Sequence, residues 1–200
     1  LAGADLAVVA NPNNPDGRCH DKAALLALLP RVGRLVIDES FADALPELSL
    51  AAEAGRDGLL VLRSFGKFYG LAGLRLGFVL GGAGDIAALS AMAGPWPVSG
   101  AAIAIGRRAL RDREWAEATA KRLEGDCFRL DAAVKLQGWQ LVGGTPLFRL
   151  YETGDARAAQ ARFAGARIWS RVFGQQPGWV RLGLPGDESE WQRLTEALSR

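Results

Sequence analysis

Short apolar runs separated by polar and glycine-rich segments mark the first half of the chain. Such near-continuous apolar runs are typical of strands that are buried on both faces of a sheet. A helix is expected between the first two runs, where Asp21 can cap a segment that extends to Leu29. Because strands that alternate with helices form parallel sheets, we expect an α/β domain with a mainly parallel sheet. The apolar runs lie at Leu6–Ala10, Leu35–Ile37, Leu59–Leu62 and Leu74–Leu80.

The second half has a different pattern, which starts after Gly94–Pro97. Helix-forming residues are almost unbroken from Ser99 to about Leu136 and predict two helices or one long bent helix. Alternating strand and helix patterns then indicate a small α+β domain. Its predicted strands are Gln140–Val142, Leu147–Tyr151, Ile168–Phe173 and Trp179–Leu184, and its helices lie near Ala156–Ala164 and Glu188–Leu198. We therefore expect a first domain over residues 1–98, connecting helices over 99–136 and a C-terminal domain over 137–200.

Composition and charge narrow the class of protein. The chain has 200 residues, is 49% hydrophobic and carries 24 basic against 22 acidic side chains. This balance, without a run of like charges, does not indicate a nucleic-acid groove or a polybasic membrane surface. No apolar run is as long as a membrane-spanning helix requires. Cys19 and Cys127 lie far apart, so we expect neither a disulfide framework nor a metal site. This use of cysteine is typical of proteins in a reducing cytoplasm.

The start of the chain is unusual. Leu1 stands in the first position, and an apolar run begins as early as Leu6. We expect that the chain enters in the middle of a fold, with the front of the first domain missing and without a signal peptide.

Polar side chains follow the first three predicted strands. Asn11, Asn13 and Asn14 come after the first strand, Asp38 after the second, and Ser64 and Lys67 after the third. Ligands of open α/β sheets bind at the carboxyl ends of the strands, so we expect these side chains to form a site. Taken singly, each has an ordinary explanation, because Asp and Asn are common in turns and Lys on surfaces.

Lys67 has small and aromatic neighbours from Ser64 to Gly70, which is unusual for a solvated lysine. A lysine in an enclosed site loses its proton more readily and can react with an aldehyde.

Three segments in order, Asn11–Gly17, Asp38–Phe41 and Ser64–Arg75, resemble the pyridoxal-phosphate enzymes of aminotransferase class I/II. The resemblance is strongest to the branch that acts on phosphorylated amino compounds, and it covers the later part of the family's length. It implies a fold type I large domain, a small C-terminal domain, and pyridoxal 5′-phosphate as the cofactor. It also implies a homodimer that acts on a small phosphorylated amino acid.

The resemblance assigns five residues to the cofactor. Lys67 would bind its aldehyde covalently and later transfer a proton, and Asp38 would pair with the pyridine nitrogen. A carboxylate at that position keeps the nitrogen protonated, so that the ring can accept electrons. Asn14 would bind the phenolic oxygen, and Ser64 and Arg75 would hold the phosphate.

The resemblance assigns two further arginines to the substrate. Arg181 matches the residue that binds the α-carboxylate, and Arg171 matches a position that meets the distal phosphate. Asn14 is expected to contact the substrate as well. Each could instead have a structural role, since Asn14 lies in a good turn sequence and arginines often extend from strand edges.

The chain departs from the family pattern at three places. Phe41 stands where many members have Tyr, so it cannot donate a hydrogen bond to the phenolic oxygen. Gly66 replaces a Ser that often precedes the lysine. We expect the chain to lack the earlier segment, which in the family supplies phosphate-binding amides and a ring stacked on the pyridine.

The motifs leave the reaction open, because decarboxylation and transamination both need the lysine, the aspartate and a clamping arginine. Similarity around Leu62–Lys67 and Gly94–Gly100 favours the cobalamin-pathway enzymes, which decarboxylate L-threonine O-phosphate. Histidinol-phosphate transamination is the alternative. A third interpretation, from another class, is a truncated chain without catalytic activity that serves as an interaction module.

Overall fold

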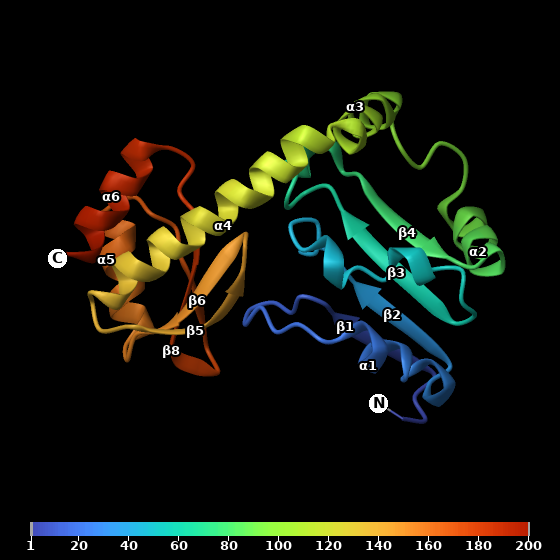
Figure 1. Cartoon of the computed structure of the whole chain (residues 1–200), viewed down its shortest axis with the longest axis horizontal. Coiled ribbons are helices and arrows are strands. Elements are labelled where there is room, and N and C mark those ends of the chain that lie inside the picture. The colour runs from blue at the N-terminus through green and yellow to red at the C-terminus, as the bar shows by residue number, and fades with distance from the viewer. Residues whose placement is uncertain (1, 200) are drawn as a thin grey trace. The chain divides into compact units, whose positions relative to one another are not determined.

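The computed structural model describes residues 2–199 and divides the chain into two units (Figure 1). The first unit comprises Leu1–Asn13 and Cys19–Glu117, and the second comprises Asn14–Arg18 and Ala118–Arg200. The loop segment Asn14–Arg18 therefore belongs with the C-terminal part of the chain. The domain boundaries given above remain a prediction.

The first unit contains a four-stranded sheet in the order β1-β2-β3-β4. Its strands are β1 (Leu6–Ala10), β2 (Arg34–Asp38), β3 (Leu59–Ser64) and β4 (Gly77–Gly81). The first three strands are parallel, which confirms the predicted mainly parallel sheet. β4 runs antiparallel to β3 and starts later than predicted. The 3-10 turn Ala72–Leu74 and a left-handed Arg75 lie between them, so the chain reverses direction before β4 begins.

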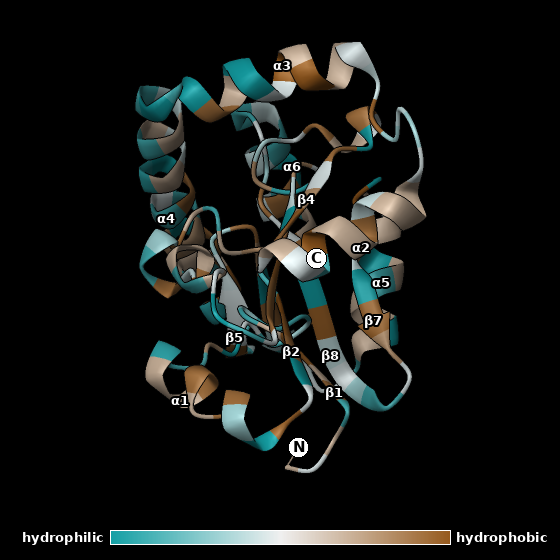
Figure 2. Cartoon of the chain, turned by 90° about the vertical axis from the view of Figure 1, so that its right-hand side faces the viewer, coloured by the Kyte–Doolittle hydropathy of each residue, from teal (hydrophilic) through white to brown (hydrophobic). Residues whose placement is uncertain are grey.

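The helices of the first unit differ in part from those predicted. Asp21 caps α1 (Lys22–Leu26) as expected, accepting hydrogen bonds from the backbone of Ala23 and Ala24. The helix stops short of Leu29, where a 3-10 turn with Pro30 follows. The sequence predicted α3 (Gly100–Arg111) but missed α2 (Ala83–Ala93), a helix rich in alanine. Figure 2 shows hydrophilic and hydrophobic segments alternating along α3.

The core of the first unit lies on one face of its sheet. The other face of β1 is open, since Leu6 and Val8 are 56% and 60% exposed. The prediction that the first apolar run is buried on both faces is therefore wrong for this strand, because only alternate residues reach the core. The core residues are Ala7, Leu25, Leu35, Ile37, Leu50, Ala54, Leu59 and Val61.

The second unit is a small α+β fold, as predicted. Its antiparallel sheet has the order β5-β6-β8-β7, formed by β5 (Gln140–Thr145), β6 (Phe148–Glu152), β7 (Arg171–Phe173) and β8 (Gln176–Gly183). Helices α5 (Ala156–Gly165) and α6 (Glu188–Leu198) belong to this unit, and so does the long α4 (Arg113–Lys135) from Ala118 onward. The core joins Leu130 of α4 to Tyr151, Phe163 and Trp191. Among the described residues, no helix combines the length and apolar character needed to cross a membrane.

Cys127 should resist alkylation in the folded protein. It is buried in α4, and its thiol donates to the carbonyl oxygen of Thr145 at 3.6 Å. Burial raises the pKa of Cys127 to about 11, although Arg149 partly offsets this effect. The reactive thiolate is therefore scarce near pH 8, whereas Cys19 is exposed. Iodoacetamide labelling followed by mass spectrometry should modify Cys19 first and Cys127 only after unfolding; equal rates in the native protein would contradict the buried position.

Candidate functional site

Two candidate residues of the first unit end neighbouring strands at the same edge of its sheet. Asp38 is the last residue of β2, and Ser64 is the last residue of β3. Asp38 pairs in register with Leu62, which brings both strand ends close together. Its Oδ1 accepts hydrogen bonds from the backbone N–H of Ser40 at 2.9 Å and from the Ser40 hydroxyl at 2.6 Å. Because both bonds use Oδ1, Oδ2 can accept a hydrogen bond from a ligand.

Lys67 lies in the loop that follows β3. Its Nζ lies 5.6 Å from the centre of the Phe41 ring, and Phe41 follows the end of β2. The structure therefore brings the lysine to the strand end that carries Asp38. The Lys67 side chain is exposed in the first unit, so the enclosure expected from its neighbours is not present in this part of the fold.

The loop between Ser64 and Lys67 is tight. The Gly66 N–H donates to the Ser64 hydroxyl oxygen at 3.2 Å. A Cβ at Gly66 would lie 3.3 Å from Cα and Cβ of Ala72, closer than most side-chain contacts. This crowding gives a physical reason for glycine at position 66.

Arg75 has an unusual backbone conformation for a residue other than glycine, with φ of 52°. Its guanidinium donates to the carbonyl oxygen of Ala72 at 3.0 Å, and its side chain is exposed. Such left-handed residues concentrate at functional sites. Its assignment to the cofactor phosphate remains a prediction.

The second unit contains the two candidate substrate arginines. Arg171 on β7 pairs directly with Arg181 on β8, so two positive charges face each other across the strands. Among the residues that the structure describes, neither forms an ion pair. Burial lowers the pKa of Arg181, and Arg171 lowers it further. Like charges at directly opposed positions are unfavourable, so an anion bound here would relieve the repulsion.

Two further residues hold the guanidinium of Arg181. Its Nη1 donates a hydrogen bond to Oδ1 of Asn14, and its Cζ lies 4.9 Å from the centre of the Phe148 ring. The sequence pointed to Asn14 and Arg181 separately, and the structure brings them together. Phe148 was missed, because a phenylalanine on a strand looks like an ordinary core residue.

Glycines allow Asn14 to reach this position. Gly17 has φ of 69°, and a Cβ on it would collide with the carbonyl oxygen of Gly144 on β5. A Cβ on Gly143 would collide in the same way with the carbonyl oxygen of Asp16. The segment Asn14–Arg18 therefore lies directly against the backbone of β5.

Asn11 has a structural role. It is fully buried, its Nδ2 donates to the carbonyl oxygen of His20, and its Oδ1 accepts the His20 N–H at 2.8 Å. Both ends of its amide are thus engaged within the fold.

A buried charged network next to the strand ends was not predicted. It contains Glu39, which follows Asp38, and Arg63, which precedes Ser64. The sequence did contain a sign of this network. Charged residues stand directly beside the candidate site residues at the ends of apolar strands.

Comparison with known proteins places the chain in a family. The family model for aminotransferase class I and II matches residues 2–198. Threonine-phosphate decarboxylases of Pseudomonas aeruginosa and a Sinorhizobium species are 44% and 43% identical to the chain over 202 residues. These matches cover 99% and 98% of the chain. A histidinol-phosphate aminotransferase of Mycobacterium bovis is 36% identical over 204 residues.

The chain spans 61% and 60% of the length of the two decarboxylases and 55% of the aminotransferase.

Solved structures share the fold. Histidinol-phosphate aminotransferase of Sinorhizobium meliloti, in complex with pyridoxal 5′-phosphate, matches with a TM-score of 0.88 and 23% identity. This match covers 97% of the chain and 56% of that protein. L-threonine-O-3-phosphate decarboxylase of Porphyromonas gingivalis matches with a TM-score of 0.82 and 24% identity, covering 98% of the chain and 63% of that protein. The chain belongs to the aminotransferase class I and II family.

Proposed function

We propose that this chain is part of a pyridoxal-phosphate-dependent decarboxylase that acts on L-threonine O-phosphate. The observation that carries the proposal is the opposed pair Arg171 and Arg181, which suits a substrate with two anionic groups. Two threonine-phosphate decarboxylases among the relatives, at 43–44% identity, support the same reaction. The products would be carbon dioxide and the phosphate ester of aminopropanol.

The residues of the first unit fit the cofactor. Oδ2 of Asp38 can accept the proton of a pyridinium, since Ser40 engages Oδ1. Lys67 offers a primary amine to an aldehyde, and Ser64 and Arg75 offer a hydroxyl and a guanidinium to a phosphate. When bound, pyridoxal phosphate accepts the electrons of the bond that breaks at Cα.

Four side chains of this protein would direct the reaction. Asp38 would hold a proton on the ring nitrogen, and Lys67 would return a proton to Cα after the carboxylate leaves. Arg181 would bind the α-carboxylate through two parallel hydrogen bonds, and Arg171 would bind the phosphate. The role of Asn14 toward the cofactor, implied by the resemblance, is part of the proposal.

Transamination of histidinol phosphate is the second candidate, and the mycobacterial relative at 36% identity supports it. A transaminase needs an amino-group acceptor, whereas a decarboxylase does not. Turnover that depends on glutamate and releases no carbon dioxide would favour this candidate. An interaction module without catalytic activity would show neither reaction.

The cytoplasmic location and the homodimer belong to the proposal too and rest on the family resemblance and the low cysteine content.

Arg171 is exposed in the described structure. Arg171→Ala should weaken binding of L-threonine O-phosphate by about 2–4 kcal/mol, the scale for losing one member of a charge pair that the bound substrate buries. A dianionic phosphate leaves water only where fixed charges replace its hydration, and a planar guanidinium does so with two hydrogen bonds. Arg171→Lys should rescue binding only in part, because an ammonium restores the charge but not the paired hydrogen bonds. The measurement is KM for phosphothreonine and for plain threonine in each variant.

Arg181→Ala is the matched control, because it should weaken both amino acids. Cofactor affinity should hardly change in the Arg171 variants, since Ser64 and Arg75 serve the other phosphate. If Arg171→Ala affects threonine and phosphothreonine equally, the phosphate does not bind at Arg171.

A further inference from the structure

A network of buried charged side chains lies at the ends of β2 and β3. Glu39 is 0% exposed, and its Oε2 accepts hydrogen bonds from Nη1 of Arg63 at 2.9 Å and from the Ser49 hydroxyl at 2.6 Å. Its Oε1 accepts the backbone N–H of Leu50 at 2.6 Å. Arg63 also binds Oδ1 of Asp43 through Nη2 at 2.5 Å. Arg63, near the end of β3, thus binds two carboxylates, and both of these carboxylates belong to residues that follow β2.

Stability alone is a weak reason for such a network. Removing charges from water is costly, and well-packed apolar residues often stabilise a fold equally well. The cost is visible at Asp43, where burial raises the pKa of the carboxyl although Arg63 lowers it in part. Its Oδ2 is buried without a hydrogen-bond partner among the described residues. Buried ionic groups are best understood where they fix a geometry that apolar side chains would leave loose.

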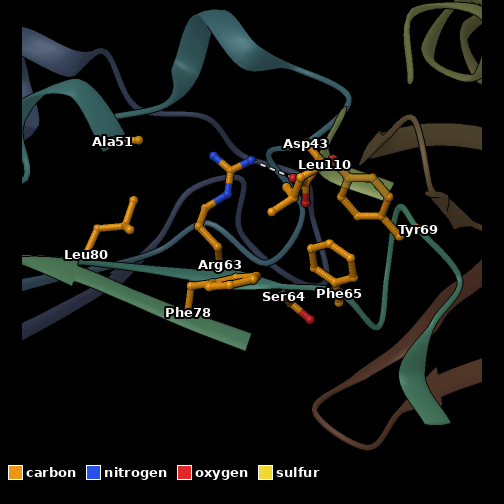
Figure 3. A pocket seen from close by; sticks show the side chains of 9 residues that line it. All are labelled: Asp43, Ala51, Arg63, Ser64, Phe65, Tyr69, Phe78, Leu80 and Leu110. Atoms are coloured by element: carbon orange, nitrogen blue, oxygen red, sulfur yellow. Dashed lines mark hydrogen bonds and ion pairs between the residues drawn. The ribbon is translucent and has the colours of Figure 1, made fainter. Parts of the chain in front are cut away.

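The network lies directly beside the candidate site residues. Glu39 follows Asp38 in the chain, and its backbone N–H donates to the carbonyl oxygen of Leu62 on β3 at 3.0 Å. Arg63 precedes Ser64, and successive side chains of a strand point to opposite faces. Figure 3 shows Arg63 extending from β3 toward Asp43 while the Ser64 hydroxyl points away from it. The network therefore holds the strand ends from the face opposite to Ser64.

One side of the network borders a cavity. The cavity has a volume of about 340 Å³, and its walls include Asp43 and Arg63 together with Phe65, Tyr69 and Phe78 (Figure 3). The guanidinium of Arg63 borders this open space and is held by hydrogen bonds to Glu39, to Asp43 and to the Ser49 hydroxyl.

We propose that Arg63 and Glu39 are positioning residues that fix the distance between the Asp38 carboxylate and the Ser64 hydroxyl. This inference rests on the proposed function, in which Asp38 and Ser64 bind the ring nitrogen and the phosphate of one rigid cofactor. A rigid ligand held at both ends binds tightly only if its two contacts keep a fixed separation. Neither Arg63 nor Glu39 touches the cofactor in this account.

The test is a double variant, Glu39→Gln with Arg63→Met, which removes both charges and keeps similar side-chain volumes. The matched control is Asp131→Asn with Arg149→Met, which removes an ion pair of the second unit whose members are also largely buried. Titration of each purified protein with pyridoxal 5′-phosphate, followed by absorbance, gives the dissociation constant. We expect the affinity to fall about tenfold or more in the double variant and to stay at the wild-type value in the control.

A purely structural role would lower the thermal midpoint without changing the affinity of the folded fraction, and that result overturns the inference. Arg63→Lys provides a second variant if the double variant does not fold. A single ammonium cannot reproduce the guanidinium contacts to both carboxylates, so the affinity should again fall. Wild-type affinity in a folded Arg63→Lys protein also overturns the inference. Failure of the wild-type protein to bind the cofactor would instead refute the proposed function.

Discussion

Lys67→Ala should abolish covalent attachment of pyridoxal phosphate and lower turnover by about 10²–10⁴-fold, the range for losing a positioned proton-transfer group. The lysine follows β3 and lies beside Phe41, at the strand edge that carries Asp38. The variant therefore lacks the amine that would bind the aldehyde and return a proton. The measurement is borohydride reduction of the loaded protein, followed by peptide mapping and by turnover assays.

Lys22→Ala is the control, since Lys22 begins α1 and has no predicted contact with the cofactor. The wild-type and control proteins should both carry the reduced cofactor on Lys67. A cofactor adduct mapped to Lys22, Lys121 or Lys135 would contradict the assignment.

Asp38→Asn should retain the cofactor but lose turnover on the order of 10²–10³-fold, the scale for removing one preorganised electrostatic partner. A neutral amide cannot stabilise the proton on the pyridine nitrogen, so the ring accepts electrons less readily. The measurement is kcat in cofactor-saturated protein, with the bound fraction followed by absorbance.

Ser40→Ala provides the comparison for this variant. It removes the hydrogen bond from the Ser40 hydroxyl to Oδ1 of Asp38 but keeps the bond from the backbone N–H and the carboxylate charge, so its loss of turnover should be smaller. Near wild-type turnover in Asp38→Asn would place the essential carboxylate elsewhere.

The sequence predicted those parts of the fold that depend on local patterns. Apolar runs located the strands, and Asp21 marked the start of α1, because both signals act over a few residues. The direction of β4 depends on its pairing with β3 across the turn Ala72–Leu74, and a short apolar run does not encode it. The exposed face of β1 likewise depends on what packs against the strand.

The candidate site shows the same division. Asp38, Ser64 and Lys67 could be found because they follow strands at the edge where ligands bind. The contact of Phe148 with Arg181 and the pairing of Glu39 with Arg63 join residues far apart along the chain. Such contacts arise only once the strands have paired, so a single sequence does not reveal them.

The central claim is tested most directly with L-threonine O-phosphate that carries an isotopic label in its carboxyl group. The cofactor-loaded protein is incubated with this substrate without any oxo-acid acceptor, and labelled carbon dioxide is measured per active site. We expect many turnovers, each releasing the labelled carboxyl group as carbon dioxide and leaving aminopropanol phosphate. A single turnover that leaves the label in an oxo acid, with the cofactor converted to its amine form, would contradict it.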